Sequence, residues 1–164
     1  MIKRFLALVL VLMTALNIHA QSLNGTWSLL LKDSQIIFIF NDGKYEMKVS
    51  VFQIAPKVAK HDFTISIPGT YTREGNAISI STNPEKAKLE VNNVVFVGDY
   101  AKKALDPQVK KQMLEELRQI HEKEKEEFLK VYTRNPQYTI ISHMNSVLTL
   151  ETPKGELWSF TRID

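Results

Sequence analysis

Apolar and polar residues alternate along most of this chain, in short stretches separated by turn residues. In the segment 44–52 every second residue is apolar, namely Tyr45, Met47, Val49 and Val51, which is typical of a strand with one solvent-facing side. The preceding Asn41-Asp42-Gly43 indicates a hairpin turn, because Asp and Gly tolerate the positive φ that such turns need. The pattern predicts nine strands, at residues 25–31, 35–40, 44–52, 61–73, 77–81, 89–97, 137–142, 147–151 and 156–163.

The pattern changes to a helical period between residues 101 and 131. One stripe of the predicted helix is apolar and contains Val109, Met113, Leu117, Ile120 and, on its extension, Phe128. Asp106 fits an N-cap and Pro107 fits the first helical position, whereas Asn135-Pro136 marks the exit. We therefore predict one long helix at about residues 106–132. A helix that covers one side of a sheet is favoured over one that contacts a partner protein.

Short strands at regular spacing, with one helix inserted late, predict a mainly β fold. We expect an antiparallel barrel of about eight to nine strands, or a strongly curled sheet, formed by a single domain at residues 21–164. The long helix would plug the barrel mouth, act as a lid or pack outside.

The first 20 residues are typical of a secretory signal peptide. Lys3 and Arg4 supply a positive start, and the apolar run 5–16 is shorter than the roughly 20 residues that cross a bilayer. Cleavage is predicted after Ala20. The protein is therefore expected to be exported, either to a bacterial periplasm or out of the cell.

Composition and charge exclude several function classes. The chain contains no cysteine, so disulfides, thiol catalysis and Cys-ligated metals are excluded. Lys and Arg outnumber Asp and Glu by 21 to 18, and loss of Lys3 and Arg4 with the signal leaves 19 against 18, a net charge of +1. This balance gives no reason to expect a nucleic-acid partner or stable insertion into a membrane after cleavage.

Candidate catalytic and metal-binding residues do not form a recognisable pattern. The chain has no nucleophile elbow, zinc-protease helix or phosphate-binding glycine loop, so neither an enzyme nor a cofactor is expected. His61, His121 and His143 are scattered, and no metal site is predicted. His121 and Glu124 are both expected on the solvated surface of the helix.

The two ends of the mature chain carry a paired signature. Gly25-Thr26-Trp27 opens the first strand, Arg162 lies in the last, and a Gly69-Thr70-Tyr71 strand precedes a Gly75-Asn76 turn. This combination resembles the lipocalin-like (calycin) domains of exported proteins from Bacteroidetes-type bacteria. The resemblance implies a closed barrel in which Trp27 and Arg162 pack together at one end, with Gly25 beside them. The inserted helix departs from that family, whose helix usually follows the last barrel strand.

The resemblance also implies a cavity for a small hydrophobic ligand, held without chemistry. The candidate wall is formed by inward-facing apolar residues: Tyr45, Met47, Val49, Phe63, Ile65, Tyr71, Phe96 and Tyr138. A carrier predicts an apolar cavity of about 300 Å³ or more. The alternative hypothesis is an interaction module with a filled core, which binds another envelope protein through the helix or the barrel rim. A third hypothesis, a small hydrolase or isomerase built on a calycin barrel, lacks a visible catalytic constellation.

Overall fold

The computed structural model of the protein describes residues 22–55, 57–132 and 135–164, so the predicted signal segment 1–20 lies outside the described residues. Its strands are β1 (Gly25–Leu30), β2 (Ser34–Asn41), β3 (Lys44–Ala55), β4 (Ala59–Glu74), β5 (Ala77–Thr82), β6 (Lys88–Phe96), β7 (Gln137–Met144), β8 (Val147–Glu151) and β9 (Leu157–Arg162). Its helices are the 3-10 helix η1 (Pro84–Lys86) and the α-helices α2 (Gly98–Lys103) and α3 (Pro107–Tyr132).

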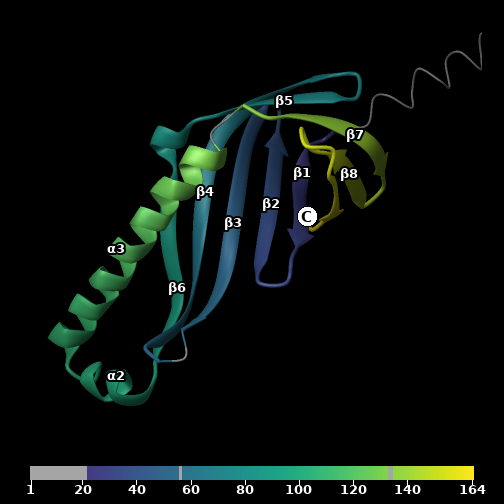
Figure 1. Cartoon of the computed structure of the whole chain (residues 1–164). Helices are drawn as coiled ribbons and strands as arrows, with labels where there is room; N and C mark the ends of the chain where they lie inside the picture. The colour runs from purple at the N-terminus through teal and green to yellow at the C-terminus, as the bar shows by residue number, and fades with distance from the viewer. Residues whose placement is uncertain (1–21, 56, 133–134) are drawn as a thin grey trace, which may run out of the picture.

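Eight of the strands form a closed antiparallel barrel (Figure 1). Neighbours along the chain pair from β1 to β5, then β5 pairs with β7, and β7, β8 and β9 follow in order. Pairing of β9 with β1 closes the ring. The predicted mainly β barrel with one long inserted helix is therefore confirmed. The ninth strand, β6, lies outside the ring and pairs with β4.

Strand β4 belongs to two parts of the sheet because it is 16 residues long. Its residues 69–74 pair with β5 inside the barrel, whereas its residues 59–66 pair with β6. The change of neighbour falls at Gly69, where a Cβ atom would lie 2.3 Å from the Ser81 carbonyl oxygen. The sheet consequently continues past the barrel as a sheet extension, made of residues 49–55, 59–66 and 88–96.

Helix α3 lies along the sheet extension and packs against β6 (Figure 1). Its start is capped as the sequence predicts, because the Asp106 Oδ1 atom accepts hydrogen bonds from the backbone N–H groups of Gln108 and Val109. Near its other end, Phe128 and Leu129 pack against the barrel core. The segment 101–131 is not one continuous helix, since α2 and α3 are separate.

The buried stripe of α3 differs from the prediction in one place. Val109, Met113 and Leu117 are partly buried, but Ile120 is 55% exposed. His121 takes the next position on the covered side and is 1% exposed. The covered stripe advances in steps of four residues, so the position after Leu117 is His121 and not the more apolar Ile120. The expectation that His121 belongs to the solvated surface was wrong.

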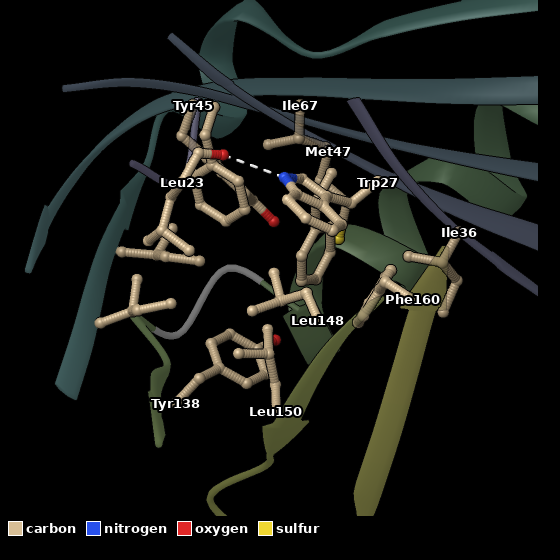
Figure 2. Close-up of a cluster of buried hydrophobic side chains, with 14 of the residues drawn as sticks. Leu23, Trp27, Ile36, Tyr45, Met47, Ile67, Tyr138, Leu148, Leu150 and Phe160 are labelled. Carbon is tan, nitrogen blue, oxygen red and sulfur yellow. Dashed lines mark hydrogen bonds between the residues drawn. The ribbon is translucent and has the colours of Figure 1, made fainter. Parts of the chain in front are cut away.

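Aromatic rings fill the middle of the barrel. Phe38 is fully buried, and its ring centroid lies 4.6 Å from that of Phe160, 5.4 Å from Tyr45 and 5.9 Å from Tyr138. Figure 2 shows Leu148, Leu150 and Phe160 meeting residues of the opposite wall. These strands alternate as expected, with every second side chain pointing inward.

The first and last strands meet at Trp27 and Arg162, which are paired in the β1–β9 register. The Arg162 guanidinium carbon lies 5.6 Å from the centre of the Trp27 ring, and the Trp27 Nε1–H donates to the Leu23 carbonyl at 2.9 Å (Figure 2). A Cβ at Gly25, whose φ is 141°, would lie 3.0 Å from an Arg162 nitrogen. Asp164 accepts from Arg162 and from the Thr26 N–H, and the bond from Arg162 holds the pKa of Asp164 below its usual value.

The central position of Phe38 predicts that the variant Phe38→Ala loses about 3–5 kcal/mol of unfolding free energy, because it leaves a cavity among packed rings. The matched variant Phe52→Ala removes the same atoms from a side chain that is 43% exposed, and we expect a loss below about 1 kcal/mol. Urea unfolding measures both. Equal losses would contradict the central role of Phe38.

The contact between Arg162 and Trp27 predicts a smaller effect. The variant Arg162→Met keeps an apolar stem but removes the guanidinium, and we expect it to lose about 0.5–2 kcal/mol in thermal unfolding. The control Arg118→Met lies on the exposed side of α3 and should change stability by less than about 0.5 kcal/mol. Indistinguishable variants would show that the guanidinium contributes nothing to barrel closure.

Candidate functional site

A pocket of about 610 Å³ opens to solvent beside the C-terminal end of α3. Four parts of the chain form its wall: the start of β3, the end of β5, the passage from α3 into β7, and the β8–β9 turn with the strand that follows. The lining residues are Tyr45, Met47, Thr82, Val131, Asn135, Pro136, Gln137, Tyr138, Thr152, Pro153, Lys154, Glu156 and Trp158. The pocket therefore lies where the barrel, the helix end and one turn meet.

The wall of the pocket is mainly apolar, with polar groups at separate points. Trp158, Tyr138 and Met47 supply most of its large apolar side chains. The Thr82 Oγ1 atom is buried and makes no hydrogen bond with any described residue. A buried polar group without a partner costs free energy, because it has lost its hydrogen bonds to water.

The β8–β9 turn is held in place by Thr152, which is buried. Its hydroxyl oxygen accepts hydrogen bonds from the backbone N–H groups of Lys154 and Glu156, at 3.3 and 3.1 Å. The same turn brings the Lys154 ammonium and the Glu156 carboxylate to the pocket as exposed side chains. The rim can thus contact either sign of charge on a ligand.

Three of the eight residues in the predicted wall line this pocket, namely Tyr45, Met47 and Tyr138. The other five lie elsewhere. Tyr71 donates a hydrogen bond to the Asn24 Oδ1 atom and contacts Phe40. Phe63 and Ile65 belong to the packed core, and Val49 packs against it. Phe96 pairs with Ala59 in the sheet extension.

The difference has a simple physical cause. Alternation shows which face of a strand is covered, but not what covers it. The covered face of β3 and β4 runs without interruption from the barrel into the sheet extension. There α3 takes the place of the cavity, and the Phe63 ring stacks 4.4 Å from the ring of His121.

Sequence reasoning missed most of the residues that come from turns and from the helix exit. Pro136 lies at the predicted exit of the long helix, and Pro153 and Lys154 lie between the predicted strands 147–151 and 156–163. No periodicity indicates that two such segments meet at one pocket. Trp158 carried the only local signal, because it is a large aromatic residue in the last strand and is half-buried.

The described residues contain no group of three or more His, Asp or Glu side chains placed to hold a metal ion. Among the same residues, no helix combines the length and apolar character needed to cross a membrane. No protein-family model, curated protein or solved structure matches this chain.

Burial raises the pKa of the Tyr45 phenol well above 10, with a further contribution from Tyr138. Because the fold disfavours the phenolate, the free energy of unfolding falls as pH rises above about 10, where an unfolded tyrosine ionises. We expect the free energy of unfolding of Tyr45→Phe, measured in urea, to fall less between about pH 9.5 and pH 11 than that of the natural protein. Parallel losses would show that Tyr45 is not held in its neutral form.

Proposed function

We propose that this protein is an exported, lipocalin-like carrier that binds a small hydrophobic molecule in the pocket at the end of α3. The observation that carries the proposal is the pocket itself, because its 610 Å³ volume and mainly apolar wall suit one small ligand. Binding would work by burial in a preformed cavity, without a chemical step or a cofactor.

The lining favours a ligand with an apolar body and one polar end. The rings of Tyr138 and Trp158 lie 6.3 Å apart and offer flat apolar surfaces. The neutral Tyr45 phenol can form a hydrogen bond with a single polar group. A medium-chain fatty acid or fatty alcohol has this chemistry.

Export is part of the proposal and rests on residues 1–20, which have the three features of a secretory signal. A periplasmic or secreted protein without cysteine depends on packing alone for stability. The ring-filled barrel centre supplies that packing.

The alternative function is an interaction module for another envelope protein. One observation favours it: the middle of the barrel is filled by Phe38 and the rings around it. The pocket favours the carrier, since a fully packed module gives no reason for an apolar hollow at the barrel end.

Native mass spectrometry of residues 21–164, purified from the natural host, tests the carrier directly. We expect a stoichiometric adduct that leaves on denaturation and can be identified after solvent extraction. A clean mass, together with no binding of a fluorescent undecanoic-acid probe, would contradict the carrier. Capture of a specific envelope protein by the same sample would then support the interaction module.

A matched pair of variants tests where the ligand binds. Gln137→Phe adds bulk at an exposed residue of the pocket lining, whereas Gln119→Phe adds the same bulk on the exposed side of α3. We expect the first variant to weaken binding of the undecanoic-acid probe by about tenfold or more, about 1.4 kcal/mol, and the second to bind like the natural protein. Equal affinities would place the ligand outside this pocket.

A further inference from the structure

Two buried histidines join α3 to the sheet extension. The Nε2 atom of His61, on β4, lies 2.7 Å from the Nε2 atom of His121, on α3. The two side chains are only 4% and 1% exposed. On its other side, the His121 ring donates from Nδ1 to the Glu124 carboxylate at 2.6 Å. The pair is away from the pocket, because neither histidine lines it.

Proton counting limits the states in which this contact survives. A hydrogen bond between two imidazole nitrogens needs one N–H and one lone pair. The contact therefore forms when both rings are neutral, or when one of them is a cation. When both rings are cations, two N–H groups and two positive charges face each other across a buried contact. The second proton therefore breaks the link between helix and sheet.

The groups around the pair offset only part of a second positive charge. From β4, Asp62 lies next to His61, but its carboxylate accepts a hydrogen bond from Asn93 of β6 at 2.8 Å. From α3, Glu124 is already bonded to His121, and the neighbouring Lys125 ammonium is paired with Glu122. The Phe63 ring stacks on His121 and adds no charge.

Burial lowers the pKa of His61 from its ordinary value of 6.5, and His121 lowers it further. The Ala59 carbonyl, Asp62 and Glu124 act in the opposite direction without outweighing these two causes. His61 is therefore neutral at pH 7 while α3 is docked. Undocking returns the imidazole to water, where its pKa is about 6.5.

We propose that His61 and His121 form a pH-sensitive latch, which holds α3 on the sheet extension near neutral pH and releases it in mild acid. Because the docked state disfavours protonated His61, docking is fully stable above about pH 6.5. Below that value, each pH unit shifts the docking equilibrium by up to about tenfold for one proton taken up, until the lowered pKa is reached.

Release of α3 would also change the pocket, a consequence that rests on the proposed function. Val131 at the end of α3 lines the pocket, and Phe128 and Leu129 pack against the barrel core next to it. Undocking removes part of the wall and widens the opening of the pocket to water. The latch would thus make a carrier that holds its hydrophobic ligand near neutral pH and releases it in acid.

The absence of cysteine permits a direct distance measurement. Gln119→Cys on α3 and Glu90→Cys on β6, both at exposed positions, would carry a donor and an acceptor fluorophore. We expect the energy transfer between them to fall when pH is lowered from about 7.5 to about 5.0, with a midpoint below 6.5. Circular dichroism at each pH shows that the strands persist.

Two variants control this experiment. His61→Phe with His121→Phe keeps two buried rings but removes both titrating groups, so energy transfer should be independent of pH. His143→Gln removes a half-buried histidine that also has a lowered pKa and packs on Trp27, and it should leave the fall intact. Constant transfer in the otherwise natural protein, or an equal fall in the double Phe variant, would overturn the latch.

If the double Phe variant does not fold, proton NMR of the natural chain decides the question. The latch requires His61 to titrate below 6.5, together with loss of amide protection in residues 107–131. Titration of His61 at or above 6.5, or without that loss, would overturn the proposal.

The undecanoic-acid probe then separates the latch from the pocket. We expect its dissociation constant to rise by about tenfold or more between about pH 7.5 and pH 5.0 in the natural protein. The double Phe variant corrects for ionisation of the probe itself. A probe that does not bind near pH 7.5 would contradict the carrier, while the fluorophore distance would still decide the latch. A dissociation constant that stays unchanged while α3 undocks would overturn the link to the pocket.

Discussion

Pairing between the first and last strands is the constraint on which the rest of this structure depends. Only two register pairs, Trp27 with Arg162 and Ser28 with Thr161, join β1 to β9. They close the ring, and in a closed ring the inward side chains pack against one another. The packing of Phe38 against Phe160 follows from it, because these rings come from strands on either side of the β1 strand. The short contact is reinforced by Asp164, which ties Arg162 to the Thr26 backbone.

The architecture could be predicted from the sequence because it depends on local signals. Alternation located the strands, Asn41-Asp42-Gly43 located a hairpin, and Asp106-Pro107 located the start of the long helix. The pairing of β4 with β5 along one part of its length and with β6 along another could not be predicted. Pairing of one strand with two different neighbours is a long-range property, and its only local mark is Gly69, which leaves room for the Ser81 carbonyl.

The candidate site could be predicted only where it coincides with the inner face of the barrel, at Tyr45, Met47 and Tyr138. The remaining wall is made by Pro136, Thr152 and their neighbours, which meet through the fold and not through a sequence period. The same limit explains the histidines. His61 and His121 are 60 residues apart in the chain, so their contact appears only once α3 is placed on β4. Continuing the four-residue step of the α3 stripe past Leu117 indicates that His121 is covered. The more apolar Ile120 indicated a different stripe.

The route of the chain between β5 and β7 has a consequence for how this fold can vary. The two strands pair directly, and the Ile80 N–H donates to the Pro136 carbonyl at 3.0 Å. The insertion 83–136, with β6 and both α-helices, therefore leaves the barrel and returns to it at one point. It is an insertion between two paired strands. The length and content of this insertion can change while the eight-strand ring keeps its register. The pocket, whose wall comes partly from this insertion, can thus change in evolution separately from barrel stability.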